Sequence, residues 1–174
     1  ADLHEANLGG ADLYEANLSK ANLSQTNLRK VKLREADLHG ANLSSANLGE
    51  ATLCESNLND TILSHADLRS ADLRSTLLCR VDLTYANLSE AILDYANLRG
   101  ANLSMADLSH AHLTETTFQY ANLECIMLTG AILERTDLRG IPWLLVRELA
   151  LQPGLIWKDV RSDSPEEQGN SAQP

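Results

Sequence analysis

Leucine occupies every fifth position from Leu3 to Leu138, and Phe118 is the one exception. Two positions before each of these residues lies alanine in 19 of 28 repeats, and the position between them is Asp or Asn, again in 19 of 28. This alternation directs the small and large side chains to one side of the backbone and the polar side chain to the other. Each pentapeptide therefore predicts a very short strand followed by a bend.

A unit of five residues cannot bury its own apolar face. Successive turns of the chain must stack so that each pairs its backbone groups with the turns before and after it. The period of five thus predicts an all-β solenoid over residues 1–140. A polar residue on the apolar side, such as Leu73→Asp, is expected to be severe because it places a charge in the core.

The tandem A-(D/N)-L-x-x pattern of residues 1–140 resembles the pentapeptide-repeat family. The resemblance implies a right-handed quadrilateral parallel β-helix with four pentapeptides to a coil, hence about seven coils. It also implies a core ladder of central residues, represented by Leu3, Leu73, Phe118 and Leu138. The exceptions to Asp/Asn support a 20-residue coil, since five of the nine fall in one column: Lys32, Thr52, Ile92, His112 and Ile132.

After the repeats, residues 141–158 predict a C-terminal cap that contains a short amphipathic helix at 143–151. Solenoids need such a segment to cover the apolar end of the last coil, and the expected covering side chains are Trp143, Leu144, Leu149 and Trp157. An amphipathic membrane anchor is the alternative, but it lacks the basic face that such anchors carry. Residues 159–174 are expected to form a disordered tail.

Nothing similar precedes Ala1, so the leucines of the first coil need a cover. Upstream residues, or a second copy docked end to end as a homodimer, are the two ways left open. No run of 18 or more apolar residues is present, and no membrane segment is expected. The three cysteines, an odd number with no bridgeable pair, favour a reducing compartment and a cytoplasmic location. Because no initiator Met is present, export with a cleaved signal stays an alternative.

Net charge of −10 limits the partner classes. The four faces of a 20-residue coil, named in chain order from residues 1–5, 6–10, 11–15 and 16–20, carry −4, −1, −4 and +1 within the repeats. An acidic chain without a basic stripe is not expected to bind nucleic acid. Quinolone-resistance members of the family resemble duplex DNA in shape and charge. The resemblance therefore raises an alternative function, a DNA mimic that modulates a type II topoisomerase such as gyrase.

Catalytic chemistry has little support in the sequence. The histidines lie in separate columns, the serines stand outside any nucleophile motif, and no phosphate-binding glycine motif or metal-ligand spacing occurs. We therefore expect no enzyme activity, no cofactor and no metal.

The candidate partner surface lies where the Asp/Asn pattern fails on the third face. Ile92, His112 and Ile132, named the apolar column from here on, follow one another there, with Tyr95 nearby. Exposed apolar groups of this kind mark partner sites, although β-branched residues also suit an exposed strand for purely structural reasons. The expected function is a non-enzymatic rigid solenoid that presents a surface to an unidentified protein partner. Many family members that resemble this chain come from photosynthetic bacteria, and some regulate cell differentiation through protein binding.

Overall fold

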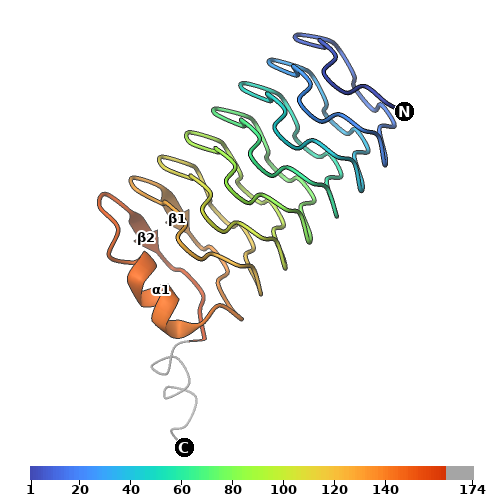
Figure 1. Cartoon of the computed structure of the whole chain (residues 1–174). Coiled ribbons are helices and arrows are strands. Elements are labelled where there is room, and N and C mark those ends of the chain that lie inside the picture. Colours follow the sequence, from blue (N-terminus) through green and yellow to red (C-terminus); the bar gives the residue numbers. More distant parts are fainter. Residues whose placement is uncertain (164–174) are drawn as a thin grey trace, which may run out of the picture.

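The chain winds into a solenoid whose coils stack along one axis (Figure 1). The computed structural model describes residues 1–163. Parallel β-bridges join each Asp/Asn position to the residue twenty positions later, from Asp2–Asn22 to Thr117–Asp137. Twenty residues are four pentapeptides, so side chains one coil apart at the same repeat position lie one above the other.

The core is a stack of leucine and small residues. From Leu23 to Leu138, every residue of the leucine ladder is at most 2% exposed, and this includes Leu73 and Phe118. Leu3 and the other leucines of the first coil are only half-buried, because no described residue covers that side of them. Of the four residues named for the predicted core ladder, Leu73, Phe118 and Leu138 are therefore fully buried and Leu3 is not.

Backbone amides explain why the repeat is five residues long. In a pentapeptide such as 101–105, one amide donates to the coil before, two donate to the coil after, and one closes the bend. The remaining amide donates to the Asp/Asn side chain two residues earlier. Every amide of the unit thus has an acceptor, which is required because an unpaired backbone N–H group that is shielded from water is costly. The bonds are Asn102 to Val81 O, Leu103 to Asn122 O, Met105 to Glu124 O, Ala101 to Leu98 O and Ser104 to Asn102 Oδ1.

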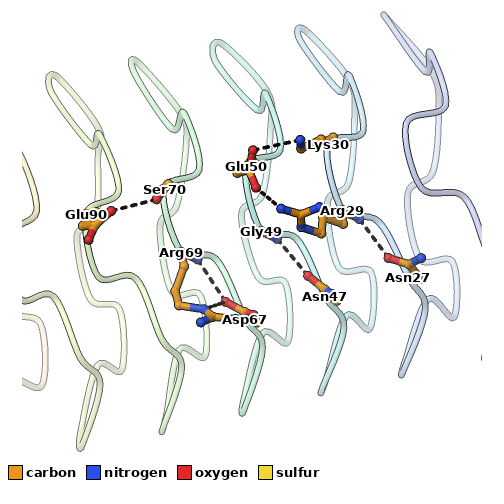
Figure 2. Close-up of polar contacts among 10 residues, drawn as sticks. All are labelled: Asn27, Arg29, Lys30, Asn47, Gly49, Glu50, Asp67, Arg69, Ser70 and Glu90. Atoms are coloured by element: carbon orange, nitrogen blue, oxygen red, sulfur yellow. Dashed lines mark hydrogen bonds and ion pairs between the residues drawn. The ribbon is translucent and has the colours of Figure 1, made fainter.

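The Asp/Asn position serves the backbone throughout. All 19 of these side chains accept a hydrogen bond through Oδ1 from the amide two residues later, at no more than 3.3 Å, and Figure 2 shows three of them at Asn27, Asn47 and Asp67. Asp and Asn are the residues whose short side chains form this Asx turn. The polar position of the repeat is therefore explained by local structure.

Bends of the coil occur at the fifth residue of each pentapeptide. All 28 of these residues, 23 non-glycine residues and five glycines, have a positive φ between 53° and 81°. A positive φ at the third position of a β-turn is the mark of a type II turn, and it disfavours residues that carry a Cβ by about 1–2 kcal/mol each. The ladder hydrogen bonds hold these residues in place, so the bends exist only as part of the stack.

Threonine replaces alanine on the inner side without leaving a polar group unsatisfied. Four of the five buried threonine hydroxyls donate to the carbonyl of a ladder leucine in the preceding coil, for example Thr116 to Leu93 at 2.8 Å and Thr136 to Leu113 at 2.8 Å, and the fifth, Thr76, bonds Leu73 of its own bend. That carbonyl otherwise accepts only the amide of its own bend, so it has a free lone pair. The inner column of Thr is therefore compatible with the core.

The C-terminal segment closes the rod. Helix α1 (Trp143–Leu149) lies at the end of the coils in Figure 1 and buries Val146 and Leu149 in the same core as the leucine ladder. Trp143 and Trp157 are half-buried against it. The prediction for Leu144 was wrong, since its side chain is 73% exposed. A helix turns 100° per residue, which places Leu144 on the side opposite Val146.

Strand β2 continues the ladder after the helix. Parallel pairing joins β1 (Ile132–Glu134) to β2 (Ile156–Lys158), with Ile132 opposite Ile156. The step here is 24 residues instead of 20, because α1 is inserted into this last turn. The helix does not pair with the backbone of residues 126–128, and the side chain of Gln152 supplies the missing hydrogen bonds. Its Nε2 donates to Ile126 O at 3.0 Å, and its Oε1 accepts from the Leu128 amide.

The predicted tail begins too early. Arg161 bridges to Asp137 and donates its amide to Thr136 O at 2.8 Å, and Ser162 is buried. Asp163 accepts a bond from the Gly140 amide at 2.7 Å. Residues 159–163 thus belong to the last turn, and the rest of the predicted tail, 164–174, lies outside the described residues. No helix within residues 1–163 has the length and hydropathy needed to cross a bilayer.

Candidate functional site

The apolar column forms a continuous ladder on the third face. Bridges join Asp72 to Ile92, Ile92 to His112 and His112 to Ile132, and the pairing of β1 with β2 then adds Ile156. The sequence pattern missed Ile156 because it lies after the repeats and after the four extra residues of the last turn. The column therefore extends over four coils at a spacing of about 4.8 Å.

Exposure differs along the column. Ile92 and Ile132 are half-buried and His112 is exposed, whereas Ile156 is 51% exposed. Tyr95 stands at the adjacent bend and is 57% exposed. The structure thus brings the four predicted surface residues together on one face and adds a fifth residue, the apolar Ile156, at the end of the rod.

Ion pairs border the column on its C-terminal side. Arg135 donates to Glu115 at 2.9 Å and to Glu134 at 2.7 Å, and Lys158 donates to Glu134 at 3.0 Å. The bond from the Lys158 ammonium lowers the pKa of Glu134. These carboxylates are therefore neutralised locally, and the border of the apolar column carries little net charge.

A missing Asp/Asn leaves an amide without its usual acceptor, and two exceptions have a replacement. At His112, the Thr114 amide donates at 2.9 Å to Asp94 of the preceding coil. At Leu77, the Cys79 amide donates at 2.8 Å to Asn59, again one coil earlier. The sequence analysis did not identify Asp94 and Asn59 as acceptors. The 20-residue spacing could have identified them, since each lies twenty positions before the residue whose amide donates to it.

On the second face, Gly49 lies between Arg29 and Arg69 of the neighbouring coils (Figure 2). Because Gly49 has no side chain, a hollow of about 280 Å³ lies between these two arginines. Arg29 pairs with Glu50, and Lys30 Nζ lies 3.2 Å from the other oxygen of the same carboxylate. Both cations on this side of the hollow are therefore already paired.

The other side of this hollow is equally satisfied. Arg69 donates two bonds to Asp67, at 2.9 and 2.7 Å, and this contact lowers the pKa of Asp67 and raises that of Arg69. The Ser70 hydroxyl donates to Glu90 at 3.1 Å (Figure 2). The second face thus presents a network of internal ion pairs.

Nucleophiles and metal ligands do not converge among the described residues. Cys54, Cys79 and Cys125 are free thiols, and burial raises the pKa of Cys54. Between residues 1 and 163, no three His, Cys, Asp or Glu side chains form a group that would hold a metal ion. His65 instead stacks on Tyr85, with ring centroids 5.0 Å apart and planes inclined by 2°.

The cap forms an apolar groove of about 570 Å³ between α1 and the last turn of the chain. Trp143 and Trp157 line it, together with Leu144 and Leu151, which are 73% and 83% exposed. Two residues of the predicted cap, Trp143 and Trp157, therefore have both a buried and a solvent-facing side.

The model of the family described as pentapeptide repeats matches the chain in eight copies, over residues 1–40, 36–74, 61–95, 71–109, 91–124 and 106–141. HetL, a pentapeptide repeat protein involved in heterocyst differentiation regulation from the cyanobacterium Nostoc sp. strain PCC 7120, is 32% identical, and the match covers 95% of this chain and 85% of HetL with a TM-score of 0.47.

Two further solved structures are more distant in sequence. Rfr23, a pentapeptide repeat protein from the cyanobacterium Cyanothece 51142, is 24% identical over 87% of this chain and 90% of its own, with a TM-score of 0.38. QnrB1, a plasmid-mediated fluoroquinolone resistance protein, is 17% identical over 99% and 92%, with a TM-score of 0.48. No curated protein matches the chain. The continuous family match and the identity to HetL together make the chain a member of the pentapeptide-repeat family.

Proposed function

We propose that this protein is a non-enzymatic, rigid β-solenoid that binds a protein partner through the apolar column. In this proposal the rod is a right-handed, four-sided β-helix of about seven coils, which the 20-residue pairing step supports. HetL, the most similar in sequence of the structures described above, is involved in regulating heterocyst differentiation. A regulatory binding role of that general kind is consistent with a chain that has no group of metal-binding side chains among residues 1–163.

The carrying observation is the loss of Asp/Asn in successive coils of the third face. In the 19 repeats that keep Asp or Asn, this side chain accepts a backbone amide, so its replacement gives up a local hydrogen bond worth about 1 kcal/mol. At Ile92 and Ile132 that bond is exchanged for apolar surface, and Ile156 prolongs the surface beyond the repeats. Grouped apolar side chains with a polar border are typical of a protein-interaction surface.

The test is affinity capture from the native host with the variant Ile92→Asp/Ile132→Asp. Aspartate at this position occurs in many other coils, so the fold is expected to hold while the captured partner is lost. The matched control is Ile62→Asp/Leu77→Asp, which likewise replaces two aliphatic side chains by aspartate at the same repeat position, on the first and fourth faces, where the side chains are 43% and 45% exposed.

Circular dichroism melting curves of both variants should overlay that of the parent chain. Loss of the partner from the third-face variant alone supports the apolar column. Equal capture by both variants would show that the column is not the binding surface.

The alternative of a DNA mimic requires a sustained acidic face. On the third face, Arg34 pairs with Glu55, Arg74 with Asp72 and Arg135 with Glu115, so local cations interrupt the negative field. We therefore expect the purified chain to leave DNA supercoiling by gyrase unchanged. Inhibition that is lost when Asp82 and Glu124 of the first face are changed to Asn and Gln would favour the mimic instead.

A further inference from the structure

A second surface lies on the fourth face, the one face whose repeats carry a net positive charge. A hollow of about 460 Å³ opens there, lined by Cys79, Arg80, Asn97, Arg99, Gly100 and Tyr120. This surface is separate from the apolar column, and it goes beyond the function proposed above.

The hollow exists because Gly100 occupies a bend between two larger side chains. At the bends of this face, each large side chain lies over the residue one coil later: Arg80 Cγ would be 3.6 Å from a Cβ at Gly100, and the Tyr120 ring would be 2.4 Å from one at Gly140. Gly100 has a φ of 67° and no side chain. Arg80 and Tyr120 therefore form the walls, with backbone at the base.

Arg99 differs from every other arginine at the fourth position of a repeat. Those arginines find a carboxylate in one of two places: two residues earlier, as Arg69 does with Asp67, or at the bend of the next coil, as Arg29 does with Glu50. For Arg99 these two places are Asn97 and Tyr120. Within residues 1–163, Arg99 accordingly makes no ion pair.

The Arg99 guanidinium instead lies over the Tyr120 ring, with its central carbon 5.5 Å from the ring centroid. This cation–π contact orients the guanidinium but leaves its N–H donors available to a ligand. Neighbouring Arg80 and Arg139 are each held by two bonds to their own carboxylates, Asp60 and Asp137. The available positive charge of the hollow is thus that of Arg99.

We propose that this hollow binds a carboxylate side chain from an acidic segment of a protein partner. Arg99 donates to the carboxylate, and the exposed Tyr120 ring, 64% accessible, packs against the segment that carries it. Arginine and tyrosine, together with tryptophan, are enriched among the side chains that dominate the energy of protein interfaces. A long polyanion such as nucleic acid fits less well, because the net charge of −10 repels it along the rest of the rod.

The experiment is an NMR titration of the Arg99 Nε–H resonance with acetyl-Gly-Glu-Gly-amide at constant ionic strength, with acetyl-Gly-Gln-Gly-amide as the uncharged probe. We expect saturable shifts with the glutamate peptide and none with the glutamine peptide. The variant Asn97→Asp supplies the internal carboxylate that Arg69 and Arg139 have, so it should weaken binding by up to about fivefold, the equivalent of one exposed ion pair.

Arg69→Gln is the matched control, since it removes an arginine from the same repeat position that is already paired, and it should leave the titration of Arg99 unchanged. In Arg99→Gln, we expect the Tyr120 ring resonances to lose their response to the glutamate peptide. The proposal is wrong if the two peptides give the same shifts, or if Asn97→Asp and the parent chain bind the glutamate peptide equally.

Discussion

Leu73→Asp is expected to abolish cooperative folding of the rod. Leu73 is 1% exposed, and the residues one coil away at the same position, Leu53 and Leu93, are 0% exposed. A carboxylate there has no solvent and no cation, so it costs several kcal/mol whether it stays charged or takes up a proton. We expect a loss of more than about 4 kcal/mol, in the range reserved for unpaired buried charges.

The loss should extend beyond one coil, because every pentapeptide depends on its neighbours for its ladder hydrogen bonds. Far-ultraviolet circular dichroism during heating measures this directly: the variant should show no cooperative transition. The matched control is Leu77→Asp, the same change at an outward position that is 45% exposed. The Cys79 amide there already has an acceptor in Asn59, so stability should stay within about 0.5 kcal/mol of the parent. Equal damage by the two substitutions would contradict the assignment of the core.

Phe118→Ala should lower the free energy of unfolding by about 3–5 kcal/mol. Phe118 is 2% exposed and is the one ladder position filled by a ring. Its truncation removes apolar contacts and leaves a cavity that a rod held by a continuous hydrogen-bond ladder cannot readily close. Urea unfolding followed by circular dichroism gives the change in stability from the shift in midpoint at constant slope.

Phe118→Leu is the control for cavity size. Leucine fits the other ladder positions, and the smaller loss of volume should cost less than about 1.5 kcal/mol. If the leucine variant is as unstable as the alanine variant, the ring of Phe118 makes a specific contact that the cavity argument omits.

Much of the fold could be predicted from the sequence, because the five-residue period determines both which side chains are buried and how the backbone is hydrogen-bonded. Leucines such as Leu73 and Leu138 are buried where the period places them. The column of exceptions also falls on one face, since residues twenty positions apart are paired throughout. Such strong local repetition leaves few competing arrangements for the chain.

The five-residue period ends at Gly140 and does not predict the structure of the residues that follow. Helix α1 adds four residues to the last turn, so the partner of Ile132 is Ile156, and no count of five or twenty would find it. Burial on a seven-residue helix depends on which side meets the rod, and this is why Leu144 was misplaced while Leu149 was not. The role of Gln152 in satisfying backbone groups of the last coil also depends on tertiary position alone.

The candidate surfaces divide in the same way. The apolar column was visible as a departure from the Asp/Asn pattern, but its end at Ile156 was not. Arg99 was hidden because its distinction is a missing contact: the residues at both usual partner positions, Asn97 and Tyr120, fit the repeat well. Only a comparison of each arginine with its neighbours in the stack separates it from the rest.

The two spacings of the rod have different consequences for the evolution of its surface. The core repeats every five residues, whereas pairing between coils repeats every twenty. Loss or duplication of one pentapeptide would therefore leave the buried side chains in place but move every later outward side chain to the neighbouring face. Only a change of twenty residues preserves both. Insertion or deletion of one pentapeptide would thus rearrange the outer surface at little cost to folding, while a binding surface built from several coils, as proposed for the apolar column, requires a fixed length of the repeat tract between its members.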